Sequence, residues 1–174
     1  MKTLPYISTA ALLGITLSAC NGNKEPTAAD FTSLLKNISE QHCTDLTKLP
    51  MDLNTYYNEI PNDPKHYKYK LAIAAKLVEP GSGPILKPTA RYAEIKAKIK
   101  DGKLCDGTYT NYVVQSANET DDGSYRARVT REFKPEPWTD EGIQKAFFFD
   151  KPVTELTYLF QKSGKDWQGT PQNQ

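Results

Sequence analysis

The first twenty residues constrain this chain most, because they are typical of a segment that is removed when a protein is exported. Lys2 is their only charged residue. An apolar run of about 14 residues follows it, which is shorter than the ~20 residues that a membrane-spanning helix needs. Such a run is typical of the apolar region of an export signal. A buried N-terminal helix is the alternative, but Pro5, Gly14 and the polar residues after Cys20 disfavour it.

Residues 17–20, Leu-Ser-Ala-Cys, resemble a bacterial lipobox. The resemblance implies that residues 1–19 are a lipoprotein signal peptide, that cleavage occurs before Cys20, and that Cys20 carries diacylglyceryl and palmitate chains. Several acyl chains anchor a protein firmly to a membrane, whereas one chain does so only marginally. Residues 20–28 are then a short tether. Asn21 stands where an Asp would retain the lipoprotein at the inner membrane, so under the enterobacterial sorting rule we expect an outer-membrane anchor with the domain facing the periplasm.

The other two cysteines, Cys43 and Cys105, are an even pair in a chain that we expect to be exported. An oxidising compartment favours a disulfide between them. Two buried free thiols are the alternative. A catalytic thiol needs a basic partner close to it, and His42 is adjacent to Cys43 only in sequence. We therefore predict a structural bridge.

Composition and motifs give no sign of a metal, cofactor or catalytic site. Lys and Arg number 22 and Asp and Glu 21, so the chain lacks the basic excess of a nucleic-acid-binding protein. There are two histidines and three cysteines, too few for a His-rich or Cys-rich metal site. The Gly-x-Ser-x-Gly motif of hydrolases and the His-Glu-x-x-His motif of metalloproteases are not present. The most prominent acidic residues are Asp121, Asp122, Asp140 and Glu141. We interpret them as residues of a turn and of a helix start, where carboxylates are common. We therefore predict a protein that is not an enzyme.

Hydrophobic spacing predicts helices in the first half of the mature chain. Phe31, Leu34, Leu35 and Ile38 lie at helical spacing after a capping-box pattern, which predicts a helix that ends near Cys43. A second helix is expected from about residue 64 to residue 77, before a Gly/Pro loop. Residues 85–100 fit either a helix or a strand.

The second half is typical of antiparallel strands. Alternating residues predict strands over 104–115 and 125–133 joined by a turn at 118–123. We expect a short helix from a Thr139 cap to Phe147, a strand over 153–161, and a loose tail over 169–174. The predicted fold class is α+β, with N-terminal helices followed by an antiparallel β-rich half, in a single domain over residues 29–168.

The order of short motifs resembles a family of small exported bacterial proteins and lipoproteins of unknown function. The motifs are the Cys43 region with Leu49-Pro50, the sequence from Leu77 to Gly81, Leu104-Cys105-Asp106-Gly107, Pro137-Trp138 and Gly164-x-x-Trp167. The resemblance implies a winged-helix-like first half, a β-rich second half and a Cys43–Cys105 bridge. This chain departs from the family's usual Cys-Tyr-Gly because it has Asp106. The family has no established activity to carry over.

Aromatic residues mark the candidate binding face. Trp138 follows a proline, and Phe147, Phe148 and Phe149 are consecutive. Three consecutive side chains cannot all point inward from one strand or one helix face, so at least one should be partly exposed. Packing in the core and loops is the alternative.

Lysines between residues 96 and 103, together with Arg91, indicate either a contact with an acidic partner or lipid headgroups, or a solvated helix face.

The features of the sequence together predict a membrane-anchored envelope lipoprotein that is not an enzyme, binds no nucleic acid, and binds another envelope protein. The alternative is a periplasmic immunity or inhibitor protein against a toxin or lysozyme, and an enzyme is the third hypothesis.

Overall fold

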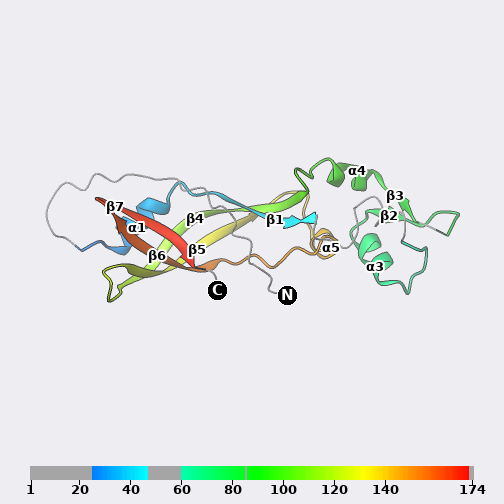
Figure 1. Ribbon diagram of the computed structural model, residues 1–174. Helices are drawn as coiled ribbons and strands as arrows, with labels where there is room; N and C mark the ends of the chain where they lie inside the picture. The colour runs from blue at the N-terminus through cyan, green and yellow to red at the C-terminus, as the bar shows by residue number, and fades with distance from the viewer. Residues whose placement is uncertain (1–24, 47–59, 85, 173–174) are drawn as a thin grey trace, which may run out of the picture. The chain divides into compact units, whose positions relative to one another are not determined.

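A computed structural model describes residues 25–46, 60–84 and 86–172, and Cys20 with the predicted signal peptide lies outside these ranges. The described elements are, in chain order, α1 (Ala28–Leu35), β1 (Glu40–Asp45), α3 (Tyr67–Ala74), β2 (Val78–Glu79), β3 (Lys87–Pro88), α4 (Ala90–Lys96), β4 (Lys103–Glu119), β5 (Tyr125–Pro135), α5 (Glu141–Ala146), β6 (Glu155–Ser163) and β7 (Asp166–Gln172) (Figure 1). The predicted α+β class is confirmed. In the described part of the chain, no helix is long and apolar enough to cross a membrane.

A five-stranded sheet in the order β1-β4-β5-β6-β7 forms most of the strand structure, and β2 pairs with β3 in a separate two-stranded sheet. The pairs β1–β4, β5–β6 and β6–β7 are antiparallel. The expected hairpin is present, with a turn between β4 and β5 in which Gly123 has a φ of 74°. Such a left-handed conformation suits glycine.

The described residues group into two compact units. One unit contains residues from α1, the second half of β4, the first half of β5, β6 and β7. In its core the ring of Phe31 stacks on Phe160 at 4.2 Å and meets Trp167 edge-on at 5.5 Å. Thr32 Oγ1 accepts a hydrogen bond from the Val114 backbone N–H at 2.9 Å, which ties α1 to β4.

The second unit contains β1, the first half of β4, the last part of β5, and α3, α4, α5, β2 and β3. Its hydrophobic core includes the fully buried side chains of Leu77, Ile95, Ile143 and Phe147. Helix α5 packs closely on α3 at Gly142, where an added Cβ would lie 2.7 Å from the Ala74 carbonyl oxygen. A larger residue at this position therefore needs the two helices to move apart.

Three local predictions were wrong. The first helix ends at Leu35, and Cys43 lies on strand β1, because pairing with β4 overrides the local helical spacing. The tail predicted from residue 169 is part of β7, which runs to Gln172 as an edge strand, a position that tolerates Pro171. The cap of the short helix α5 is Asp140 rather than Thr139. In the ambiguous segment 85–100, residues 90–96 form helix α4.

Candidate functional site

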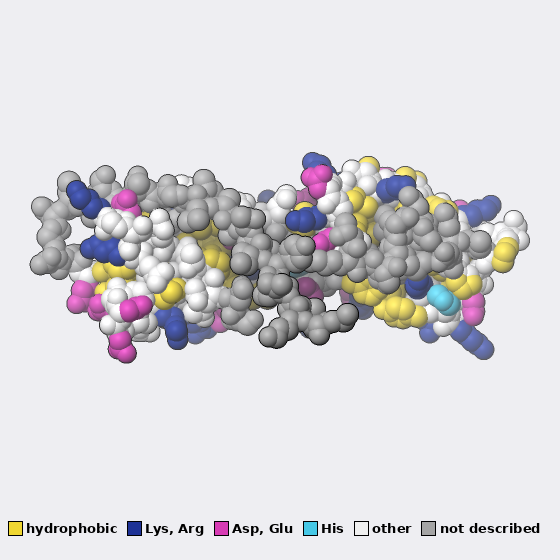
Figure 2. Space-filling view, viewed as in Figure 1, with side chains coloured by type: hydrophobic (Ala, Val, Ile, Leu, Met, Phe, Trp, Pro, Cys, Tyr) yellow, Lys and Arg dark blue, Asp and Glu magenta, His cyan; other side chains and the backbone are white. Residues whose placement is uncertain are grey.

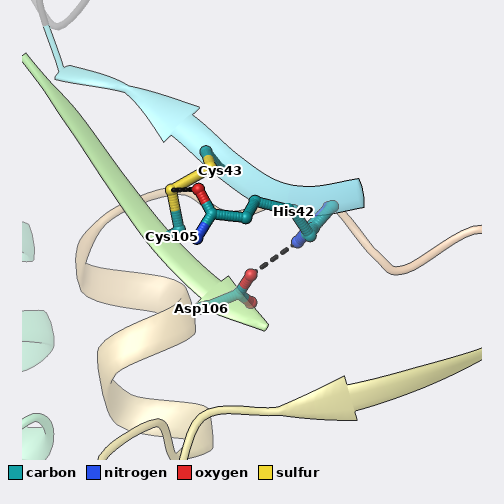
Figure 3. The surroundings of a disulfide bond; sticks show 5 residues. His42, Cys43, Cys105 and Asp106 are labelled. Carbon is teal, nitrogen blue, oxygen red and sulfur yellow. Dashed lines mark hydrogen bonds and ion pairs between the residues drawn. A yellow bond between two sulfur atoms is a disulfide. The ribbon is translucent and has the colours of Figure 1, made fainter. Parts of the chain in front are cut away.

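The predicted bridge between Cys43 and Cys105 is confirmed, and it joins β1 to β4 at directly paired positions (Figure 3). The register then changes, because His42 pairs with Gly107 and leaves Asp106 as an extra residue on β4. This is a β-bulge, which redirects the side chain of the bulged residue. The bulge brings the carboxyl of Asp106 toward the ring of His42.

His42 and Asp106 make a short side-chain contact next to the disulfide. His42 Nδ1 lies 2.6 Å from Asp106 Oδ1. The Asp106 side chain is completely buried, whereas that of His42 is 15% exposed. When the carboxyl is ionised, Nδ1 carries the proton and donates it in a charge-assisted hydrogen bond. Asp106 Oδ2 is buried and has no hydrogen-bond partner within the described residues, so His42 is the main stabilising group for this carboxylate.

The backbone of Asp106 also connects the bulge to the loop before α5. Its carbonyl oxygen accepts a hydrogen bond from the Glu136 backbone N–H at 2.8 Å and another from Thr139 Oγ1 at 3.2 Å. Both groups lie between β5 and α5. The bulged residue therefore positions this loop as well as the His42 ring.

Aromatic rings surround His42. Its ring centroid lies 5.6 Å from those of Tyr109 and Phe133, both nearly perpendicular to it, and 6.2 Å from that of Phe149. The Arg131 guanidinium lies 3.5 Å from the centre of the Tyr109 ring and pairs with Glu40 at 2.8 Å. These contacts restrict His42 to one orientation and reduce its access to solvent.

Gly107 permits this close packing. An added Cβ at this position would lie 2.3 Å from the Phe133 ring and 2.7 Å from the Lys134 carbonyl oxygen. Three successive residues of β4 therefore carry the three features of this region: Cys105 the disulfide, Asp106 the buried carboxyl, and Gly107 the close approach of the Phe133 ring. Sequence reasoning missed the His42–Asp106 pair, because the pair depends on a bulge that moves the strand register by one residue and leaves no signal in the spacing of the sequence.

A His–Asp pair orients an imidazole for general-base catalysis when a nucleophile or substrate reaches the second ring nitrogen. In the described part of the chain, His42 has no hydrogen bond to a hydroxyl or thiol group, and rings from three other residues pack around it. The described residues also contain no group of three or more His, Cys, Asp or Glu side chains that could hold a metal ion. The arrangement is suited to holding β1, β4 and the loop before α5 together.

The candidate acids at α5 serve as local structural groups. Asp140 caps α5 by accepting a hydrogen bond from the Ile143 backbone N–H at 2.9 Å and pairs with Arg91 of α4 at 2.7 Å. Desolvation raises the pKa of Asp140, but the Ile143 and Arg91 hydrogen bonds and the Arg91 charge together lower it from its ordinary value. The hydrogen bond from Lys145 lowers the pKa of Glu141.

Asp122, in the turn between β4 and β5, also serves as a local structural group. Hydrogen bonds from the hydroxyls of Ser124 and Thr120 and from the Ser124 backbone lower the pKa of Asp122 to about 2. General acids at neutral pH have raised pKa values. Neither Asp122 nor Asp140 has that property.

The four residues of the predicted aromatic face differ in how deeply they are buried. Phe147 is fully buried in the core, whereas Phe148 is 44% exposed. Phe149 packs against the core and His42, and Trp138 packs against the core with the Lys98 ammonium 5.7 Å from its ring centre. The expectation that at least one Phe of the run is partly exposed is confirmed. Phe148 is the member of the run that a partner reaches most readily.

Phe148 also has an unusual backbone conformation, with a φ of 56°. It follows the C-cap of α5, where the N–H of Phe148 donates to Lys145 O and that of Phe149 to Gln144 O. These bonds form a Schellman motif, whose left-handed position is usually glycine. A bulky residue with positive φ is a genuine outlier and costs roughly 1–2 kcal/mol. Phe148 therefore combines a left-handed backbone conformation with a partly exposed phenyl ring.

No protein-family model, no curated protein and no solved structure matches the chain. The resemblance to small exported bacterial proteins therefore stays a prediction. The predicted lipidation site, Cys20, lies outside the described residues.

Proposed function

We propose that this protein is a lipoprotein of the bacterial envelope, anchored through Cys20, whose folded part binds another envelope protein and has no enzymatic role. The Cys43–Cys105 bridge supports an oxidising location. The lipobox pattern supports the anchor. We also propose that the anchor lies in the outer membrane, with the folded part facing the periplasm, and that the first half has a winged-helix-like arrangement.

The observation that carries the binding role is Phe148. Residues that are kept in a strained conformation cluster at functional positions, and aromatic residues, Phe among them, are enriched in the cores of protein–protein interfaces. Phe148 combines a positive φ with 44% exposure. Glycine would suit its backbone better, so a contact made by the phenyl ring is a reason for keeping this side chain.

The end of α3 supplies a matched control. Lys76 has a φ of 55°, and the N–H groups of Lys76 and Leu77 donate to Ile73 and Ala72 in the same Schellman pattern. Both Phe148→Gly and Lys76→Gly remove backbone strain at a helix end. Only Phe148→Gly removes the candidate contact side chain.

We expect Lys76→Gly to raise the free energy of unfolding by about 1 kcal/mol. Phe148→Gly should leave the stability at least equal to that of the wild type, because the relief of strain offsets the lost packing. Only Phe148→Gly should weaken partner binding, by about 30-fold if Phe148 contributes the ~2 kcal/mol typical of such a residue. The measurement is quantitative crosslinking and capture from the native envelope with tagged, acylated protein, alongside urea denaturation of each variant.

Equal recovery of the same proteins by wild type, Lys76→Gly and Phe148→Gly would contradict a binding role for Phe148. Recovery of one stoichiometric partner that only Phe148→Gly loses would support it. A toxin or a lysozyme as that partner would support the alternative of an immunity or inhibitor protein, whereas another envelope protein would support the proposed role.

A further inference from the structure

The chain is nearly neutral as a whole, but its charge is unevenly distributed. Residues 60–103, which we call the basic lobe, contain ten Lys and Arg and four Asp and Glu, a formal net charge of +6 within a chain of net charge +1. The lobe holds α3, β2, β3 and α4. It belongs to the compact unit of residues 38–111 and 131–154, whose formal net charge is +1, so the excess of positive charge is local to the lobe. A local excess of cationic side chains attracts anionic surfaces.

The fold keeps these charges on the outside of the lobe. Eight of its ten cationic side chains are exposed lysines: Lys65, Lys70, Lys76, Lys87, Lys96, Lys98, Lys100 and Lys103. The side chains of Leu77, Val78, Leu86 and Ile95 in the lobe are buried in the hydrophobic core. Figure 2 shows Lys and Arg side chains projecting from the part of the molecule that carries α3 and β3.

The start of α3 adds an exposed aromatic residue to this charge. Tyr67 is 61% exposed, the highest value among the large hydrophobic residues in the described ranges. It lies between the exposed lysines Lys65 and Lys70, with Lys68 next to it. Tyrosine has an apolar ring and a polar hydroxyl, which suits the boundary between lipid and water, and lysine can keep its ammonium among headgroups while its stem lies on apolar material.

We propose that the basic lobe contacts the anionic phospholipid surface of the membrane, with Tyr67, Lys65 and Lys70 at the contact. This inference rests on the proposed anchoring through Cys20, which keeps the domain next to a bilayer and so raises the effective concentration of lipid. Lysines near an anionic bilayer each contribute a modest amount to binding, so the lobe alone binds weakly and reversibly. Together with the acyl anchor, it would hold the domain against the membrane.

The test uses the mature chain from residue 20 onward with Cys20→Ser, so that no acyl group contributes to binding. The chain is mixed with vesicles of phosphatidylcholine alone or with added phosphatidylglycerol, and the bound fraction is measured by flotation. We expect binding only to vesicles that contain phosphatidylglycerol. This binding should be lost between about 0.1 M and about 1 M salt, where the screening length falls from about 10 Å to about 3 Å.

A paired set of variants locates the contact. The double variant Lys65→Gln/Lys70→Gln should lower the partition constant about 30-fold, at the strength typical of lysines near an anionic surface. The control Lys162→Gln/Lys165→Gln removes the same charge from exposed lysines outside the lobe and should retain most of the binding. Tyr67→Ser should weaken binding without changing its salt dependence. Circular dichroism checks that each variant keeps its fold.

Three outcomes would overturn the inference. The first is equal binding to vesicles with and without phosphatidylglycerol, and the second is no binding to either. The third is an equal loss in the two double variants, which would mean that total charge rather than the lobe matters. None of these outcomes bears on the acylation of Cys20 or on capture of a partner by Phe148, so failure of this inference is distinguishable from failure of the proposed function.

Discussion

Replacing both Cys43 and Cys105 with serine is expected to lower the free energy of unfolding by about 4 kcal/mol. The bridge closes a loop with a sequence separation of 62 residues, and loop-closure entropy in the unfolded chain gives this value for a loop of that length. Domains are stable by only about 5–15 kcal/mol, so the loss is a large share of the total. Urea denaturation of the oxidised wild type and the double variant, both with Cys20→Ser, measures it.

The reduced wild type is the control for the serine side chains. It should unfold at the same urea concentration as the double variant, and the unfolding slope of both should be steeper, because an unbridged unfolded chain exposes more surface. Identical midpoints for the oxidised wild type and the double variant would show that the bridge does not stabilise the fold. A midpoint shift in the variant but not in the reduced wild type would assign the effect to serine instead.

Replacing His42 with phenylalanine is expected to cost about 1–3 kcal/mol, the range typical of leaving a buried polar group without its hydrogen-bond partner. Phenylalanine keeps a ring among Tyr109, Phe133 and Phe149, so the loss reports mainly on the hydrogen bond. The variant leaves the fully buried Asp106 carboxyl without its partner. Chemical denaturation near pH 7 measures the loss.

A double variant distinguishes this reason from a simple packing defect. Asp106→Val leaves His42 Nδ1 without its acceptor and should cost about 1–3 kcal/mol. The variant His42→Phe/Asp106→Val removes both polar groups and should be much less destabilised than the sum of the two single variants, as is typical of coupled neighbours. Additive losses would contradict the view that His42 stabilises the Asp106 carboxylate.

The sequence was sufficient to predict those parts of the fold where local pattern and long-range packing agree. The presence of a helix at Phe31, of the β4–β5 hairpin and of a short helix before Phe147 follows from spacing and from polar residues at turns and helix starts, although the end of the first helix and the cap of the short helix do not. The bridge follows from an even number of cysteines once Cys20 is assigned to the lipid. Strand β1 could not be predicted, because its sequence Glu-Gln-His-Cys-Thr-Asp has no apolar alternation and becomes a strand only through pairing with β4.

The candidate site was predictable only in part for the same reason. The exposure of one Phe in the run 147–149 follows from geometry, but which one depends on where α5 ends and on the left-handed conformation of Phe148. The pair of His42 and Asp106 depends on a bulge that moves the register by one residue. A strand register cannot be read from the spacing of residues that are 64 positions apart.

The most direct test of a lipid-anchored, disulfide-bonded envelope protein is the intact mass of the chain recovered from the membranes of a bacterium that produces it. We expect residues 1–19 to be absent, Cys20 to carry acyl chains, and alkylation to add mass at Cys43 and Cys105 only after reduction. The variant Cys20→Ala should accumulate as an uncleaved chain. A wild-type chain that begins at Met1 with an unmodified Cys20, or that takes up alkylating reagent at Cys43 and Cys105 without reduction, would contradict the account.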